Sequence, residues 1–519
     1  MAAQHESVPV NLEAAATTTI KASIKTSGPK ASEGGPASLK MEDDLNMEDT
    51  TTTTTTTTST SSPQLPFCIT ENTVNFQKRF PNFPATTCLH TVIGGRKSQE
   101  DRFCVCPNLT EQLENVLFMG VFDGTVGHFA SDTVKDLVVP FLKQTSEYQF
   151  LEQNCISNPE YCEQNPDQVL KLLSKAFKKM YWKSDEELLK QAGIHEKHYA
   201  SCTSVTLLLF QDYVCVGHLG DSRVCLMYIN EDNLKRLEGL GVKKAVLEDG
   251  EGKENGKGNN DENQNMTDGT SNSLTTSSDA AELNNQMKNL NISDKSYNGK
   301  IPALDPKFAA KDSFRVDTIP ISKVEYLVEG NFITSDHKPD TPEERTRIEN
   351  SGGSVEYLHN HQHKPFIRGG DFQQRKLLGE SPMQLQYSRA FGGKDLKPFG
   401  LSGDPTVNVT KRQRQFMGFI LASDGLWDVL GADFASRLAT KTFLESVQEN
   451  GKVNTTFEGT GAGYPCKNAS QALVEAALAA GSTDNITAVC VFYDTVGGDI
   501  GKSGTSGATR ENKIPELYD

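Results

Sequence analysis

The chain has 519 residues, more than one ordinary domain needs, and its formal net charge is −16. An acidic chain repels the phosphate backbone, so this charge argues against general nucleic-acid binding. The 11 cysteines are scattered and lack metal-site or redox spacing, as is typical of reduced thiols in a core. The start of the chain lacks the features of a signal peptide, and no apolar run is long enough to span a membrane. We therefore expect a cytoplasmic or nuclear protein that binds no membrane.

Three segments have too little apolar character to form a core. Residues 1–65 are rich in Ala, Ser, Thr and Pro, with an unbroken threonine run from Thr50 to Thr58, and we expect a disordered tail. Residues 248–299 are acidic and of low complexity, which indicates a disordered insertion in a surface loop, where extra length costs little stability. Residues 498–519 are predicted to form a flexible C-terminal tail. One ordered domain is then expected over residues 66–497.

Within that domain, short β-rich runs alternate with helical patterns. Ser204–Phe210 and Tyr213–His218 are separated by two residues, which predicts an antiparallel hairpin. Further strands are expected at Val116–Phe122, Val224–Tyr228, Gly418–Ser423 and Ile486–Tyr493, and helices at His128–Leu142, Gln168–Leu189, Asn468–Ala480 and from Glu343 to a stop at Gly352-Gly353. Strands and helices intermix without a regular βαβ rhythm, so we predict an α+β layered domain rather than a parallel, doubly wound one.

Three aspartates stand beside runs that should be buried strands. Asp123 follows Val116–Phe122, Asp424 follows the run that ends at Ser423, and Asp484 precedes the run that begins at Ile486. A carboxylate at the mouth of a buried strand costs desolvation energy unless something compensates its charge. Three such carboxylates that converge indicate a hard divalent cation, Mg²⁺ or Mn²⁺, and therefore metal-assisted hydrolysis.

Other polar blocks along the chain carry weaker signals. Arg96 has the geometry to hold a phosphate, and Glu100 and Asp101 could hold metal-bound waters, although the block taken alone is more typical of a charged surface turn. Asp221, after an apolar run, fits either an outer metal ligand or a carboxylate that caps backbone amides. Asp428 lies four residues after Asp424, so one helical turn would put both on one face. His337 and Arg389 are each interpreted as structural hydrogen-bonding residues.

Taken in order, these blocks resemble the metal-dependent serine/threonine protein phosphatases of type 2C. The matching blocks span roughly residues 88–494, and they are Glu100-Asp101, Val121-Phe122-Asp123-Gly124, Gly220-Asp221-Ser222-Arg223, Asp336-His337-Lys338-Pro339, Ser388-Arg389-Ala390, Ala422-Ser423-Asp424-Gly425-Leu426-Trp427-Asp428 and Asp484-Asn485-Ile486-Thr487. The resemblance implies a central antiparallel β-sandwich flanked by helices, with two Mg²⁺ or Mn²⁺ ions at one end. It also implies phosphoprotein substrates, and we expect a monomer.

The resemblance also implies a role for each site residue. Asp123 would bridge both ions, and the Gly124 carbonyl would bind the second. Asp424 and Asp484 would bind the first ion, while Glu100 and Asp101 would act mainly through metal-bound water. Arg96 would hold the substrate phosphate. Asp221 and Asp428 match the residues of a weaker third metal site.

The sequence departs from the family pattern beside the expected metal site. The family usually has a histidine after Asp-Gly, proposed as the general acid for the leaving alkoxide, and this chain has Thr125 there, followed by Val126. General acid catalysis is worth about 10²–10⁴-fold, so its loss would slow turnover and leave metal binding intact. His128 is a candidate substitute, but its offset of three residues should displace it from the leaving group. The leading hypothesis is an active phosphatase; a phosphatase-like binding or regulatory protein and a small-phosphoester hydrolase remain as alternatives.

Overall fold

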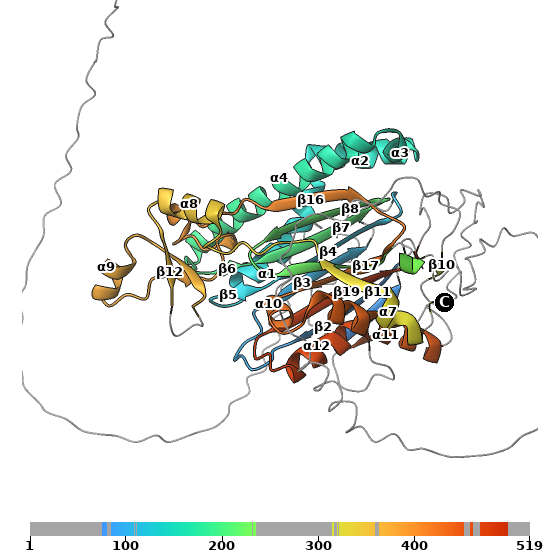
Figure 1. Ribbon diagram of the computed structural model, residues 1–519. Helices are drawn as coiled ribbons and strands as arrows, with labels where there is room; N and C mark the ends of the chain where they lie inside the picture. The colour runs from blue at the N-terminus through green and yellow to red at the C-terminus, as the bar shows by residue number, and fades with distance from the viewer. Residues whose placement is uncertain are drawn as a thin grey trace, which may run out of the picture. The chain divides into compact units, whose positions relative to one another are not determined.

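The computed structural model describes residues 75–79, 85–107, 109, 112–230, 232–234, 314–315, 319, 321–358, 363–450, 457–459 and 468–496. All of them belong to a single compact unit, residues 63–519. The predicted tails, 1–65 and 498–519, and the predicted insertion, 248–299, lie outside the described residues. Within the unit, two large antiparallel sheets stack face to face between helices (Figure 1).

The first large sheet has five strands in the order β16-β8-β7-β4-β3. The predicted hairpin is confirmed, because Phe210 pairs with Tyr213 across the two-residue turn. All residues of the predicted strand at Val116–Phe122 are buried, as expected for a continuous apolar run covered on both faces. The strand bounds are β3 Arg102–Pro107, β4 Val116–Phe122, β7 Ser204–Phe210, β8 Tyr213–Leu219 and β16 Thr406–Lys411.

The second large sheet has seven strands in the order β11-β9-β17-β19-β2-β1-β18. Its central strands β17 and β19 are buried along their whole length, because this sheet too is covered on both faces. The strand bounds are β1 Asn75–Arg79, β2 Ala85–Val92, β9 Arg223–Ile229, β11 Val328–Phe332, β17 Phe416–Ala422, β18 Phe457–Gly459 and β19 Ile486–Tyr493.

Helices cover the outer face of each large sheet. On the five-stranded sheet they are α1 Phe129–Lys143, α2 Ser146–Ser157, α3 Tyr161–Gln164 and α4 Pro166–Ile194; on the seven-stranded sheet they are α11 Ala432–Asn450 and α12 Ala469–Ala479. A third core fills the space between the sheets, with side chains such as Met119, Leu207 and Phe419. The predicted α+β sandwich flanked by helices is therefore confirmed. The helix predicted over Gln168–Leu189 is longer than expected at both ends.

A smaller group of elements follows β11 in the chain and has its own core. It contains a three-stranded sheet, β12-β13-β14, packed beside α8 around Ile348, Ile367 and Leu385. Figure 1 shows it in yellow at one side of the sandwich, next to β5 and β6. Its elements are α8 Pro342–Asn350, β12 Ser354–Tyr357, β13 Pro365–Arg368, α9 Phe372–Leu377 and β14 Gln384–Leu385. We call residues 342–385 the side unit.

A three-stranded ribbon, β15-β6-β5, connects the side unit to the sandwich. Its strands have two residues each: β5 Gly124–Thr125, β6 Ser201–Cys202 and β15 Phe391–Gly392. Thr125 lies opposite Ser201, and Phe391 lies opposite Cys202. The remaining short elements are β10 Phe314–Arg315, η2 Ile321–Lys323, α7 Val324–Leu327, η4 Lys397–Phe399, α10 Asp424–Trp427 and β20 Thr495–Val496.

The chain leaves the seven-stranded sheet after β9 and returns to it at β11, beside the point of departure. Ile229, the last residue of β9, pairs with Val328, the first residue of β11. The Asn233 side chain donates hydrogen bonds to the carbonyls of Tyr326 and Leu327, at 3.0 and 3.3 Å. The outgoing and returning chains are therefore fastened to each other at the sheet.

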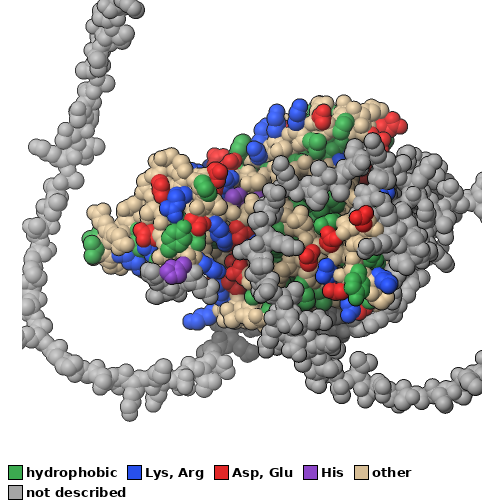
Figure 2. Space-filling view, viewed as in Figure 1, with side chains coloured by type: hydrophobic (Ala, Val, Ile, Leu, Met, Phe, Trp, Pro, Cys, Tyr) green, Lys and Arg blue, Asp and Glu red, His purple; other side chains and the backbone are tan. Residues whose placement is uncertain are grey.

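The surface and the helices add two observations. On the face drawn in Figure 2, acidic and basic side chains are intermixed rather than gathered by sign. In the part of the chain that the structure describes, no helix is both long and apolar enough to cross a membrane.

Candidate metal and phosphate site

The pairing of the strands brings the predicted aspartates to one end of the sandwich. Ala422, at the end of β17, pairs with Arg223 and Ala488, so Asp424 lies where β9 and β19 begin. In the other sheet Phe122 pairs with Arg102, which places Asp123 beside Asp101. Carboxylates that are distant in sequence are thus delivered to the same end of both sheets.

The electrostatics of Asp123 show that these carboxylates lie close together. Burial raises the pKa of Asp123 well above its usual value, and the negative charges of Asp424, Asp101, Asp221 and Asp484 raise it further. The pKa of Asp424 is raised in the same way, by burial first and then by Asp221, Asp428 and Asp484. Without a cation, Asp123 and Asp424 therefore favour their neutral forms.

Asp101 is the most enclosed of the group, with 2% of its surface exposed. Burial raises its pKa to about 6, although Ser423 donates a hydrogen bond of 2.8 Å to its Oδ2 atom. Its Oδ1 atom and the Oδ1 atom of Asp221 are buried without a hydrogen-bond partner. Unpaired buried carboxylate oxygens are costly, so each of these atoms is a free site for a positive charge.

Basic side chains approach three of the carboxylates. Arg96 donates to Asp484 Oδ2 at 2.5 Å, and Lys338 donates to Asp221 Oδ2 at 2.5 Å. Lys364, in the side unit, lies 3.3 Å from Asp428 Oδ2. With the side chains so arranged, no group of three or more His, Cys, Asp or Glu in the described residues is placed to hold a metal ion.

The donor set nevertheless fits a hard divalent cation. Carboxylate and carbonyl oxygens are the ligands that Mg²⁺ and Mn²⁺ prefer, and here they come from rigid strand ends. The free Oδ1 atoms of Asp101 and Asp221 and the raised pKa values of Asp123 and Asp424 all mark a lack of positive charge. A divalent cation would supply that charge.

Two glycines permit the close packing that brings these loops together. A Cβ atom on Gly425 would lie 2.1 Å from the Asn485 carbonyl oxygen, so only glycine lets α10 approach the loop that carries Asp484. A Cβ atom on Gly124 would lie 2.5 Å from the Glu100 carbonyl oxygen. Both glycines belong to the Asp-Gly pairs that the sequence singled out.

Asn485 and Glu100 fasten the loops around the carboxylates. The Asn485 side chain accepts from the Glu100 amide at 2.8 Å and donates to the carbonyls of Ile93 and Ser98. The Glu100 carboxylate accepts from Ser98 Oγ and from the Gly127 amide, each at 2.9 Å. Glu100 therefore holds the turn that follows Asp123.

The turn after Asp123 contains the departure from the family pattern. Tyr387 donates a hydrogen bond of 2.8 Å to Thr125 Oγ1. Val126 has a positive φ of 63° and is 59% exposed, so it points away from the core. His128 lies 2.6 Å from Asp132, which Arg102 also contacts. His128 is thus directed to the start of α1, as expected from its offset.

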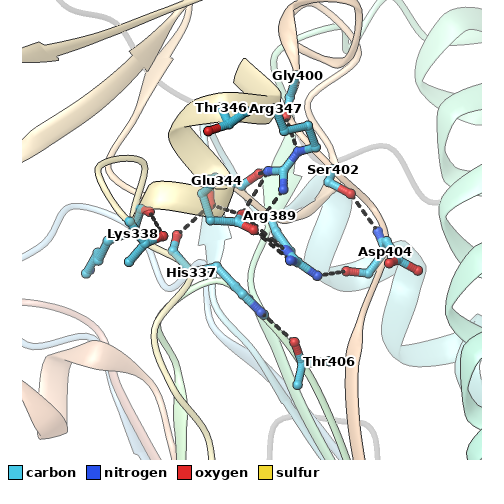
Figure 3. A network of polar contacts seen from close by, with 12 residues as sticks. His337, Lys338, Glu344, Thr346, Arg347, Arg389, Gly400, Ser402, Asp404 and Thr406 are labelled. Atoms are coloured by element: carbon cyan, nitrogen blue, oxygen red, sulfur yellow. Dashed lines mark hydrogen bonds and ion pairs between the residues drawn. The ribbon is translucent and has the colours of Figure 1, made fainter. Parts of the chain in front are cut away.

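A polar network joins the side unit to the sheets (Figure 3). The Glu344 carboxylate, on α8, accepts hydrogen bonds from Arg347, Arg389 and Ser388. Hydrogen bonding to these groups lowers the pKa of Glu344 far below its usual value. His337 lies 2.9 Å from Thr406 Oγ1 and stacks on His218, with ring centres 4.5 Å apart. These contacts support the interpretation of His337 and Arg389 as structural residues.

Sequence reasoning assigned no role to three residues of the site. Lys338 belongs to the Asp-His-Lys-Pro block, but nothing in the sequence pairs it with Asp221. Ser423 precedes a predicted ligand, and its hydroxyl bonds to Asp101 across the interface between the sheets. Tyr387 precedes the Ser-Arg-Ala block. The only signal in the sequence was that each of these residues lies in or beside a motif. The sequence did not show which residue each of them contacts.

Comparison with known proteins identifies the family. The family model described as protein phosphatase 2C matches residues 88–238 and 324–486, which is more than half of the chain. The chain belongs to the protein phosphatase 2C family. This confirms the resemblance that the ordered motifs indicated.

Individual members of the protein phosphatase 2C family show the same similarity. The crystal structure of a serine-threonine phosphatase 2C from Toxoplasma gondii is 35% identical, with a TM-score of 0.57 over 82% of this chain and 99% of that one. Protein phosphatase 2C 7 of Arabidopsis thaliana is 33% identical over 159 residues, and probable protein phosphatase 2C 78 of the same plant is 36% identical over 174 residues. These alignments span only 27% and 37% of those two proteins, and 31% of this chain.

Proposed function

We propose that this chain hydrolyses phosphoserine and phosphothreonine in proteins and depends on Mg²⁺ or Mn²⁺. The observation that carries the proposal is the cluster of carboxylates from Asp101, Asp123, Asp221, Asp424 and Asp484 at one end of the sandwich. Membership of the protein phosphatase 2C family supports the reaction, and the free carboxylate oxygens support the cation.

In this proposal the metal ligands are those matched by position. Asp123, the Gly124 carbonyl, Asp424 and Asp484 would hold two ions, with Asp123 shared between them, the Gly124 carbonyl on the second, and Asp424 and Asp484 on the first. Bound ions would acidify a water molecule and offset the charge of the phosphate. The remaining residues would make outer contacts: Glu100 and Asp101 would act through water, and Asp221 and Asp428 would hold a weaker third ion.

Arg96 is the proposed phosphate ligand. Its side chain is more than half exposed and already lies against a carboxylate, Asp484, at the edge of the cluster. A guanidinium binds phosphate oxygens through paired hydrogen bonds, and a divalent cation on Asp484 would compete for the same carboxylate. Arg96 would then turn from Asp484 to the incoming phosphate, which orients the ester bond.

One observation favours a second candidate, a phosphatase-like protein that binds phosphoproteins with little catalysis. Thr125 stands where the family usually has the histidine proposed as general acid. A protein of this kind would keep the metal and phosphate contacts but lack turnover. Phosphopeptide binding without phosphate release would identify it.

A phosphopeptide assay separates the two candidates. The full chain is incubated with a phosphoserine peptide in Mn²⁺ or in EDTA, and released phosphate and bound peptide are both measured. We expect Mn²⁺-dependent release of phosphate. In Asp424→Asn the rate of release should fall by at least about 100-fold, because the variant lacks a ligand of the metal ion that would stabilise the developing charge. Asp136→Asn is the matched control, since Asp136 is an exposed aspartate on α1 paired only with Lys135 among the described residues. Absence of Mn²⁺-dependent release by the wild type would refute the proposed activity.

A further inference from the structure

Three hydroxyl groups form a chain that ends beside the carboxylate cluster. Tyr387 donates to Thr125 Oγ1 at 2.8 Å, and Ser201 Oγ lies 3.1 Å from the Tyr387 hydroxyl. The single proton of the Tyr387 hydroxyl is used in the bond to Thr125, so Ser201 must be the donor to Tyr387. The order of donation is therefore Ser201 to Tyr387 to Thr125.

The fold holds the members of this chain in place. Thr125 and Ser201 lie directly opposite each other in the ribbon formed by β5 and β6. Ser201 is fully buried, and Tyr387 is 7% exposed and packs into the core formed by Ile348, Ile367 and Leu385 of the side unit. Thr125 is only partly buried, so it is the end of the hydroxyl chain that a substrate can reach.

The direction of donation leaves the Thr125 proton free. Thr125 Oγ1 accepts from Tyr387, and its own O–H bond has to point elsewhere. Thr125 directly follows Asp123 and Gly124, two of the proposed metal ligands. A hydroxyl that already accepts one hydrogen bond is a stronger donor in the next, because hydrogen bonds in a chain polarise one another.

The tyrosine remains a proton donor throughout the working range. Burial raises the pKa of Tyr387 far above its usual value, and the charges of Asp123 and Asp221 raise it further.

We propose that Thr125 donates a hydrogen bond to the ester oxygen that leaves the phosphorus, and that Tyr387 and Ser201 are positioning residues that orient Thr125. The inference rests on the proposed phosphatase function. Thr125 would then be a catalytic residue that stabilises the developing alkoxide charge without giving up its proton. A hydroxyl chain thus replaces the missing histidine in part.

The reaction balances without a further reactant. The oxygen of a water molecule bonds to phosphorus, and the bond from phosphorus to the serine oxygen breaks with its electron pair on that oxygen. The serine oxygen takes one proton from solvent water, and the phosphate product releases one proton to solvent. Thr125 stabilises the negative serine oxygen before that proton arrives and ends the cycle unchanged.

The test compares two substrates that differ in their need for a hydrogen bond at the leaving oxygen. The leaving group of a phosphoserine peptide is a basic alkoxide, which leaves poorly. The leaving group of p-nitrophenyl phosphate is a stable phenolate. Thr125→Val should lower kcat on the peptide by about 10- to 100-fold and change kcat on p-nitrophenyl phosphate less than about threefold. Thr125→Ser should restore the peptide rate, because it keeps the hydroxyl. Tyr387→Phe should shift the same ratio in the same direction by a smaller factor.

Tyr181→Phe is the matched control for Tyr387→Phe. Tyr181 is also a buried tyrosine whose hydroxyl bonds to two side chains, Ser204 and Thr206. It lies on helix α4, in the core between the helices and the five-stranded sheet. It should leave the ratio of the two rates unchanged. Equal losses on both substrates in Thr125→Val, or no loss on either, would overturn the proposal. A wild type inactive on both substrates in Mn²⁺ would instead overturn the proposed function, and this inference with it.

Discussion

Replacing Asp101 by asparagine should stabilise the metal-free protein at neutral pH. Asp101 is almost fully buried, one of its oxygens has no partner, and its pKa is raised from 3.8 to about 6. Between these two pH values the folded protein keeps a proton that the unfolded chain releases, so a rise in pH favours unfolding. Above pH 6 the full penalty applies, and at 1.36 kcal/mol per pKa unit it amounts to about 3 kcal/mol. An amide in place of the carboxylate removes this penalty.

The assay is urea unfolding in EDTA at pH 4.5 and pH 7.5. The stability advantage of Asp101→Asn over the wild type should grow by about 2 kcal/mol between these pH values, because part of the penalty is already present at pH 4.5. Adding Mn²⁺ at pH 7.5 should stabilise the wild type more than the variant, since the ion replaces the missing proton. In Asp136→Asn, the exposed control, the difference from the wild type should not depend on pH.

Two results would refute this reasoning. The first is a stability difference between Asp101→Asn and the wild type that is the same at both pH values. The second is equal stabilisation of the two proteins by Mn²⁺. Either result would mean that the buried charge of Asp101 does not destabilise the metal-free protein.

Three further predictions concern the surroundings of the site. Burial lowers the pKa of His218 to about 4, so its contribution to stability is complete above pH 6.5 and is lost as pH falls toward 4; His218→Gln should flatten this acid loss of about 3 kcal/mol in thermal unfolding. Glu344→Gln leaves Arg389 and Arg347 without their carboxylate and should cost about 3–5 kcal/mol in urea unfolding, against little change for the half-exposed Glu356→Gln. Gly425→Ala should weaken Mn²⁺ binding by at least about tenfold in titration calorimetry, because the added methyl group collides with the Asn485 carbonyl and separates Asp424 from Asp484. Gly431→Ala, where a Cβ atom meets nothing within 4 Å, should bind Mn²⁺ like the wild type.

Much of the sandwich was predictable because its strands are continuous apolar runs that end abruptly. Val116–Phe122, Ser204–Phe210 and Ile486–Tyr493 have the predicted bounds, since each run is buried on both faces and is followed or preceded by polar turn residues. The same property predicted where the carboxylates lie. An aspartate directly beside a buried run is placed at the end of the sheet by the strand itself.

The contacts between distant segments could not be predicted from one sequence. The strands β5, β6 and β15 have two residues each, too few to show any periodicity. The hydrogen bond from Tyr387 to Thr125 joins residues 262 positions apart. The pairing of Lys338 with Asp221 depends equally on the tertiary fold. Such contacts arise from how distant segments of the chain pack together, which local patterns do not encode.

The fastening of β9 to β11 has a consequence for how this chain tolerates change. About 100 residues separate two strands that are hydrogen-bonded neighbours, so the ends of this long segment are as close as those of an ordinary hairpin. A tenfold change in loop length alters the closure free energy by only about 2 kcal/mol. The site lies at the other end of β9, beside Arg223 and Asp424. A change in the length of this connection therefore need not move the end of β9 that lies beside the site.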